Sequence, residues 1–301
     1  MKVPQIIWQI SGGCTHECWY CLAQYRNNPY FKTTDEYLHV VDLLLNHGQR
    51  KNIPKVRWTF KGGEPLQFPN FNMVLKAVKQ RPAEVCVETS GGESWFEVLE
   101  NINLIDELVL THHYWQNESV LEYIIDLCRD NNKKLKLYIP LQPGKMRESK
   151  DLVARYKEQG IDCEEQVLRE QNWTMSSKYT LRDLNIYYGR PEDWEPPPPA
   201  PPPPPKPVDT SGPPAPPPVD PQWVDPRQGN GNPSYTGKPC YAGVDYLYID
   251  SKGFAHGSDC GGRDMGNVFN PEWLPPDEPF ACPMLFCHSE NDRRNIRIIK
   301  D

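Results

Sequence analysis

Three cysteines near the start of the chain, Cys14, Cys18 and Cys21, are spaced CxxxCxxC within the segment GGCTHECWYC. A structural zinc site takes four protein ligands, whereas a [4Fe–4S] cluster held by three cysteines keeps one iron free for a further ligand. The triplet is also compatible with a zinc site whose fourth ligand comes from elsewhere in the chain. Three thiolates therefore indicate a metal centre with an open position, where chemistry can take place.

A second motif, Lys61-Gly62-Gly63-Glu64-Pro65, directly follows residues 55–60, whose alternation of polar and bulky side chains predicts a strand. Two glycines let the backbone approach a ligand without a Cβ in the way, and the Glu64 carboxylate can bind an ammonium group. The alternative without a functional role is an ordinary turn before a helix. At the end of a strand that follows a cysteine triplet, the motif is better interpreted as part of a functional site.

Together, CxxxCxxC with Tyr20 before the third cysteine and the GGEP tetrapeptide resemble the radical S-adenosylmethionine (radical SAM) superfamily. The resemblance implies that the three cysteines ligate a catalytic [4Fe–4S] cluster whose open iron binds the methionine moiety of S-adenosyl-L-methionine. One electron would then cleave the cofactor, and a 5′-deoxyadenosyl radical would abstract a substrate hydrogen. The resemblance also implies that the cofactor-binding site consists of Tyr20, Gly62, Gly63, Glu64, Pro65 and the residue at the end of the third strand, Ser90.

The periodicity of the first two-thirds of the chain predicts alternating strands and helices. Strands are predicted at residues 3–10, 55–60, 85–88, 108–111, 135–139 and 164–168, and helices at residues 35–46, 71–78, 120–128 and 152–156. Such alternation implies right-handed parallel crossovers, so we expect an α/β fold, a partial (β/α)6 TIM-like barrel. Ligands in such sheets bind at the carboxyl ends of the strands, where both motifs lie.

Further candidate site residues follow from this rule. Glu88, Thr89 and Ser90 end the third strand, where related enzymes often carry a Thr-Asn-Gly-like turn beside the cofactor, so Ser90 departs from that pattern. His112 and His113 end the fourth strand, and one of them could face the site as a proton donor or a ribose contact. A satisfied structural histidine is the alternative for either one.

Composition agrees with a globular enzyme: 301 residues with a net charge of −7, no apolar run long enough for a membrane span, and no signal peptide. We expect a cytoplasmic protein that contacts no membrane, and the negative charge argues against nucleic acid as a partner. An arginine cluster near the end, Arg293, Arg294 and Arg297, could form a local patch or a solvated tail. Ten cysteines with metal-type spacing indicate ligands and reduced thiols in place of disulfides.

A proline-rich segment interrupts the chain, since sixteen of residues 196–221 are proline. Neither sheet nor helix accommodates this composition, and residues 196–205 should form a polyproline II rod of about 30 Å. Two interpretations stay open: a semi-rigid spacer, or a docking segment for a proline-binding domain. We expect a linker at residues 191–236.

After the linker come four more candidate ligands, Cys240, Cys260, Cys282 and Cys287, together with a predicted β-hairpin at residues 246–250 and 254–256. This arrangement resembles the C-terminal modules of SPASM and twitch radical SAM enzymes in a shorter form, and the resemblance implies one auxiliary [4Fe–4S] cluster. A structural zinc site on the same four thiolates, or one with His256 or His288 as a ligand, is the alternative. The module is predicted at residues 237–290, with a tail at 291–301 and the barrel at 1–190.

The remaining cysteines, Cys86, Cys128 and Cys163, fall in apolar strand or helix patterns and are predicted to be small buried side chains.

The resemblance implies a peptide- or protein-modifying enzyme or one that oxidises a small molecule, supplied with electrons by a flavodoxin or ferredoxin. Related peptide-modifying enzymes often carry an N-terminal leader-binding domain, and we expect none before the first strand. The alternatives are an iron–sulfur adaptor without turnover and an enzyme similar to 7-carboxy-7-deazaguanine synthase.

Overall fold

The computed structural model describes most of the barrel and parts of the C-terminal region, namely residues 4–16, 18–21, 32–92, 95–170, 175–194, 237, 239–241, 243–244, 246–257 and 264–281. Several predicted features lie outside these ranges: the proline-rich segment, Cys260, Cys282, Cys287, His288 and the C-terminal arginines. Among the described residues, no helix is both long and apolar enough to cross a membrane.

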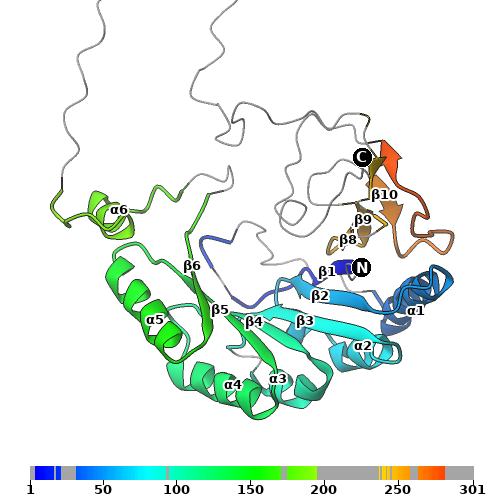
Figure 1. The fold of residues 1–301 in the computed structure, drawn as a ribbon, viewed down its shortest axis with the longest axis horizontal. Coiled ribbons are helices and arrows are strands. Elements are labelled where there is room, and N and C mark those ends of the chain that lie inside the picture. The colour runs from blue at the N-terminus through cyan, green and yellow to red at the C-terminus, as the bar shows by residue number, and fades with distance from the viewer. Residues whose placement is uncertain are drawn as a thin grey trace, which may run out of the picture.

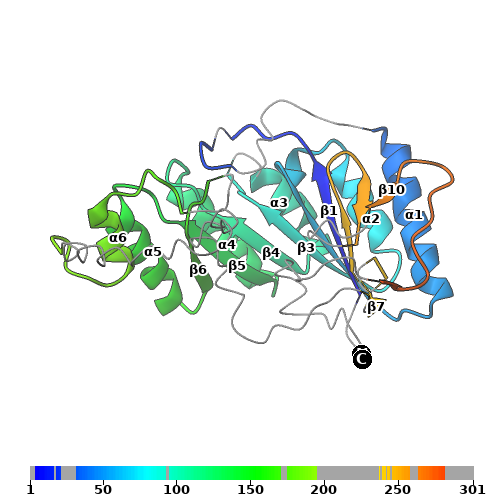
Figure 2. The same ribbon diagram turned by 90° about the horizontal axis from the view of Figure 1, so that it is seen from above.

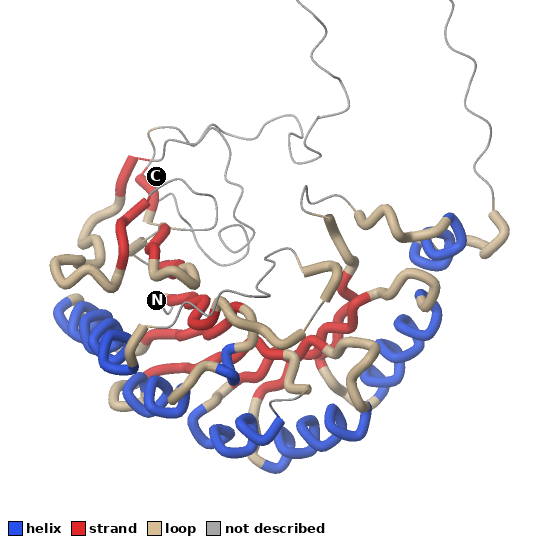
Figure 3. Tube along the Cα trace, turned by 180° about the vertical axis from the view of Figure 1, so that it is seen from behind, coloured by secondary structure: helices blue, strands red, loops and turns tan. Residues whose placement is uncertain are grey.

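Six parallel strands form the centre of the fold in the order β1-β2-β3-β4-β5-β6 (Figure 1). Their bounds are β1 Gln5–Ser11, β2 Val56–Gly62, β3 Ala83–Thr89, β4 Glu107–Thr111, β5 Lys134–Pro140 and β6 Asp162–Gln166. The helices that connect them cover the convex face of the curved sheet and leave the concave face open (Figure 3). The predicted α/β partial barrel is therefore confirmed.

The connecting helices are α1 Thr34–Arg50, α2 Phe71–Val78, α3 Trp95–Asn101, α4 Glu118–Asp130 and α5 Met146–Glu158, and α6 Leu181–Tyr187 follows the sheet. The N-terminus of α1 is fixed by a capping box, in which the Thr33 and Glu36 side chains each bond the other's backbone N–H. The sequence pattern does not predict helix α3. Val98 and Asn101 are its only buried residues, so its apolar stripe is weak.

The core lies between the sheet and these helices. Large aromatic side chains fill it near β1 and β2, where the rings of Trp8 and Tyr37 stack at 5.4 Å and those of Trp58 and Phe60 at 6.0 Å. Cys86, Cys128 and Cys163 are at most 2% exposed, as predicted. Burial raises the pKa of the Cys128 and Cys163 thiols to about 11, so both stay protonated at neutral pH.

The C-terminal hairpin extends the barrel sheet. Strand β8, Tyr246–Ile249, pairs in parallel with β1, and β9, Phe254–His256, and β10, Asp264–Asn267, follow at the edge (Figure 2). A separate two-stranded ladder joins β7, Pro239–Cys240, to β11, Phe280–Ala281. Chain segments far apart in sequence thus form one continuous sheet with β1 inside it.

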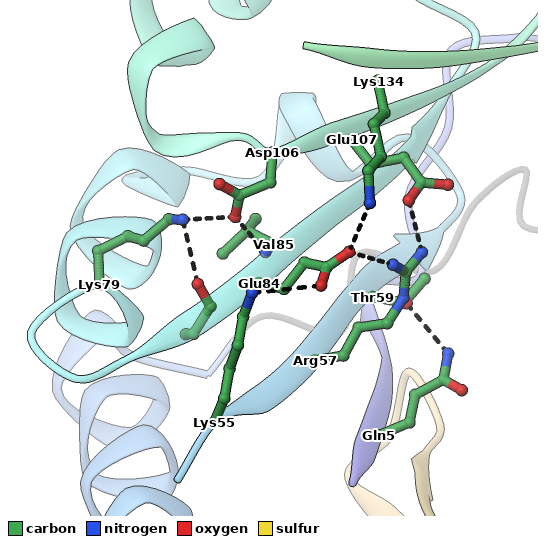
Figure 4. Close-up of polar contacts among 11 residues, drawn as sticks. Gln5, Lys55, Arg57, Thr59, Lys79, Glu84, Val85, Asp106, Glu107 and Lys134 are labelled. Atoms are coloured by element: carbon green, nitrogen blue, oxygen red, sulfur yellow. Dashed lines mark hydrogen bonds and ion pairs between the residues drawn. The ribbon is translucent and has the colours of Figure 1, made fainter. Parts of the chain in front are cut away.

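Charged side chains line the amino end of the concave face, where they form an ion-pair network (Figure 4). Arg57 on β2 bridges two carboxylates, at 2.5 Å to Glu84 and 2.8 Å to Glu107. Lys55 and Lys134 also approach Glu84, at 3.4 and 3.5 Å. Each partly buried charge therefore has an opposite charge beside it, which offsets the cost of removing it from water.

Candidate active site

A cavity of about 640 Å³ opens at the carboxyl ends of the strands. Its wall combines the cysteine loop after β1, the glycine loop after β2, and the ends of β3, β4 and β6. The predicted site residues that line it are Cys14, Cys18, Tyr20, Cys21, Gly62, Gly63, Glu64 and Ser90. Pro65 is buried at the start of a short 3-10 helix, Pro65–Gln67, and does not line the cavity.

The glycine loop and the cysteine loop lie directly against each other. The backbone N–H groups of Gly63 and Glu64 donate hydrogen bonds, both 2.9 Å long, to the carbonyls of Ser11 and Gly13. A Cβ at Gly63 would lie 1.9 Å from the Gly13 oxygen, and one at Gly62, whose φ is +139°, would lie 2.3 Å from the Ser11 oxygen. Glycine is required at both positions because two backbones meet there.

The Glu64 carboxylate is 1% exposed and accepts four hydrogen bonds. Thr89 donates its hydroxyl at 2.5 Å, Ser90 donates its hydroxyl at 2.9 Å and its backbone N–H at 3.0 Å, and the Leu66 N–H donates at 3.2 Å. All of these donors are neutral. Glu64 therefore links the glycine loop to the turn at the end of β3, where the sequence analysis predicted Ser90 as a site residue.

The cysteine loop is joined to the same network by His16. Its Nε2 lies 2.7 Å from the Ser90 hydroxyl oxygen. Because the Ser90 proton points to Glu64, the hydroxyl accepts the bond from His16, which assigns the proton of this imidazole to Nε2. A chain of hydrogen bonds thus runs from the cysteine loop through Ser90 to Glu64.

The three thiols border the cavity from one loop: Cys18 is buried, and Cys14 and Cys21 are partly exposed. Within the described ranges, no three His, Cys, Asp or Glu side chains are gathered as they are around a bound metal ion. A set of three soft donors on one short loop that lines a cavity nevertheless fits a [4Fe–4S] cluster, which the three cysteines would hold with one iron left for a further ligand.

His113 faces the cavity and contacts the loop. Its Nδ1 lies 2.5 Å from the Tyr20 hydroxyl, its Nε2 lies 3.9 Å from the Cys18 sulfur, and its ring stacks on Trp115 at 4.8 Å. Burial, and then the neighbouring His16 and His112, lower the pKa of His113 to about 3, so the ring is neutral. With Tyr20 donating to Nδ1, we assign the remaining proton to Nε2, directed at Cys18.

His112, the other histidine at this strand end, lines a second cavity of about 510 Å³ instead, beside α4 and α5. Burial lowers its pKa as well. Successive residues of a strand point to opposite faces, so the sequence could predict that one histidine of the pair faces the site but not which one.

The sequence prediction missed several cavity residues: Gln9, Lys61, Thr111 and residues 165–169. The signal was available, because all of them lie at strand ends and Gln9, Lys61 and Thr111 follow the alternation of the concave face. Glu88 was noted as a strand-end residue and also lines the cavity. Applying the strand-end rule to the first and sixth strands would have found Gln9 and residues 165–169.

Of the four C-terminal cysteines, Cys240 lies within the described ranges and is 4% exposed. It pairs with Phe280, two residues before Cys282 in the sequence, and the adjacent pair of the ladder joins Pro239 to Ala281. Cys260, Cys282 and Cys287 lie outside the described residues, so their predicted roles as ligands stay predictions.

A model of the radical SAM superfamily matches residues 8–164, more than half of the chain, which contain both motifs, strands β2 to β5 in full and parts of β1 and β6. The chain therefore belongs to the radical SAM superfamily. No curated protein sequence matches it.

Solved structures share its fold. Native anSMEcpe with bound AdoMet and Cp18Cys peptide superimposes with a TM-score of 0.52 at 13% identity, covering 89% of this chain and 78% of that one. Streptococcus suis SuiB bound to S-adenosylmethionine gives a TM-score of 0.52 at 15% identity, covering 90% of this chain and 64% of that one. At such identities the likeness concerns the fold.

Proposed function

We propose that this protein is an enzyme that reductively cleaves S-adenosyl-L-methionine at a [4Fe–4S] cluster ligated by Cys14, Cys18 and Cys21. Cys14, Cys18 and Cys21 would hold the cluster, and when bound, cluster and cofactor would supply one-electron cleavage of the cofactor's sulfonium and abstraction of a hydrogen atom from the substrate. The observation that carries the proposal is the direct contact of the cysteine and glycine loops at one cavity, inside the span that matches the superfamily.

The chain's own residues would act mainly by position. At Gly62 and Gly63 the cofactor would pack against a backbone that carries no side chains. Ser90 lines the same cavity. Glu64 already accepts four bonds from neutral donors, so its role is to hold the turn at Thr89 and Ser90 in place. The Nε2 proton of His113 would stabilise the Cys18 thiolate.

The proposed reaction is modification of a peptide or protein, with oxidation of a small molecule as the other class. The peptide held by anSMEcpe supports the first class, although that relative is similar in fold alone. A flavodoxin or ferredoxin in the cytoplasm would supply the electron, and the proline-rich segment would serve either as a spacer or as a dock for a proline-binding domain.

A second cluster at Cys240, Cys260, Cys282 and Cys287 is part of the proposal. Supporting it, the β7–β11 ladder brings Cys240 beside the chain segment that leads into Cys282. Zinc on the same thiolates is the competing outcome, because four thiolates bind either metal.

The test is anaerobic reconstitution of the full chain, with iron, sulfide and zinc counted in the wild type and in a Cys14/Cys18/Cys21 triple alanine variant. About eight irons per chain should fall to about four in the variant, and 5′-deoxyadenosine formation with dithionite should be lost. About four irons plus one zinc in the wild type would make the C-terminal site structural. Clusters without any cofactor cleavage would instead support an iron–sulfur adaptor.

A further inference from the structure

Three neighbouring strands present a row of polar side chains to the cavity: Gln9 on β1, Lys61 on β2 and Glu88 on β3. Gln9 is paired directly with Lys61 in the sheet register. The next register pair, Phe60 with Val87, places the following residues Lys61 and Glu88 side by side on the same face. All three side chains are partly buried.

Other partly buried charges on the concave face have partners of opposite charge. Arg57 pairs with Glu84 and Glu107 (Figure 4), and Lys136 pairs with Glu164 at 2.8 Å. Lys61 and Glu88 differ: neither makes an ion pair or a hydrogen bond with any residue within the described ranges. The Lys61 ammonium lies 5.9 Å from the centre of the Tyr248 ring on β8, which faces the same side.

A partly buried charge without an ion-pair partner is costly, and a ligand of opposite charge offsets the cost. Lys61 offers a compact cation for a carboxylate, and Glu88 offers an acceptor for an ammonium group. Adjacent strands are about 4.8 Å apart, so the row suits a ligand whose two opposite charges lie close together. A ligand with a single sign of charge would meet repulsion from one of the two residues.

We propose that Lys61 and Glu88 bind a zwitterionic group of the substrate, an aminocarboxylate such as that of an amino acid or of a peptide carrying one. The inference rests on the proposed function, since it identifies the substrate class of the same cavity. On β2, Lys61 directly precedes Gly62 and Gly63, the two residues that the proposed function assigns to cofactor binding.

Four probes of equal carbon-chain length test the charge preference: L-norvaline, δ-aminovalerate, glutarate and cadaverine. Their affinities would be measured by saturation-transfer NMR on the reconstituted full chain with S-adenosyl-L-methionine present. L-norvaline, whose opposite charges lie on one carbon, should bind about tenfold more tightly than the dianion or the dication, and more tightly than δ-aminovalerate, whose charges are far apart. Equal binding of all four, or binding of none, overturns the proposal.

Charge-swapped variants make the test specific. Lys61→Glu and Glu88→Lys should each weaken L-norvaline binding about tenfold, and the double swap should restore it. Lys136→Gln, which removes a paired lysine from the same face, should keep the wild-type preference. Failure of the double swap to restore binding, or an equal loss of S-adenosyl-L-methionine affinity in Lys61→Glu, would assign these residues to another role.

The same preparation separates the two proposals. If dithionite-driven formation of 5′-deoxyadenosine proceeds while the probes show no charge preference, the substrate inference fails alone. If neither iron nor cofactor cleavage is found, the proposed function itself fails.

Discussion

The imidazole of His16 and the hydroxyl of Ser90 are 74 positions apart in sequence but 2.7 Å apart in space. This bond links the cysteine loop to the end of β3. Since Ser90 also donates to Glu64, the loop that would hold iron and the loop that would hold the cofactor share one hydrogen-bond network. Serine fills this role with a single hydroxyl that accepts from one side and donates to the other.

Replacing Ser90 by alanine should therefore weaken cofactor binding. The change removes the hydroxyl bond to Glu64 and leaves His16 without its acceptor, and we expect the Kd for S-adenosyl-L-methionine to rise about tenfold. Equilibrium binding to the reconstituted protein measures it. Ser90→Thr should recover most of the affinity, and exposed Ser119→Ala should change nothing; unchanged affinity in Ser90→Ala would remove Ser90 from the site.

Cys18→Ala should abolish assembly of the N-terminal cluster, because two thiolates would remain to hold it. The iron count should drop by about four per chain, with no 5′-deoxyadenosine formed. Cys128→Ala is the matched control, since this cysteine is buried against the core in α4, away from the cavity. Cofactor cleavage at the wild-type rate in Cys18→Ala would show that the cluster assignment is wrong.

Gly63→Ala should separate the two loops. The new methyl group would meet the Gly13 carbonyl, so either backbone must move, and we expect a loss of about 1–3 kcal/mol of unfolding free energy together with a lower iron content. Gly48→Ala is the control: it lies in α1, where a Cβ would meet Val56 at an ordinary 3.8 Å, and alanine should stabilise the helix by about 0.5–1 kcal/mol. Calorimetry on both variants decides the comparison.

Arg57→Ala should destabilise the barrel by about 2 kcal/mol, because Glu84 and Glu107 lose their shared partner. Arg129→Ala should cost less than about 0.5 kcal/mol, since its pair with Asp126 is exposed. Urea unfolding at neutral pH compares the two. Equal losses in both variants would mean that the network adds nothing beyond surface pairing.

The Arg57 effect should depend on pH. Burial alone would raise the pKa of Glu84, but the charges of Arg57, Lys134 and Lys55 outweigh it and lower that pKa. A lowered carboxyl pKa stabilises the fold fully above the unfolded value of about 4.3 and loses this contribution as the pH falls through the folded value. The difference in unfolding free energy between wild type and Arg57→Ala should thus shrink below about pH 4. A difference independent of pH would contradict the ionic origin.

Local patterns in the sequence predicted the parallel strands and the residues at their ends, because side-chain alternation and glycine placement act over a few residues. Cys14, Gly63 and Ser90 were found in this way, and all three line the cavity. What local patterns could not predict are contacts made across the sheet. The His16–Ser90 bond and the selection of His113 over His112 depend on strand twist and loop packing.

The unpaired state of Lys61 and Glu88 was also invisible in the sequence. Lys61 and Glu88 carry the same charges as Arg57 and Glu84, which form an ion pair on the same face. Only the register and the surrounding side chains separate charges that stabilise the barrel from charges that face an open cavity.

The parallel pairing of β1 with β8 bears on how the chain folds during synthesis. The ribosome makes β1 first, but its partner on one side emerges about 240 residues later, which at ordinary elongation rates means a delay of roughly 10–50 s. Throughout this interval the apolar edge formed by Ile6 and Trp8 has no strand beside it on that side. The nascent protein therefore has an open β-edge of the kind that chaperones shield, and truncation before Tyr246 should make the barrel prone to aggregate.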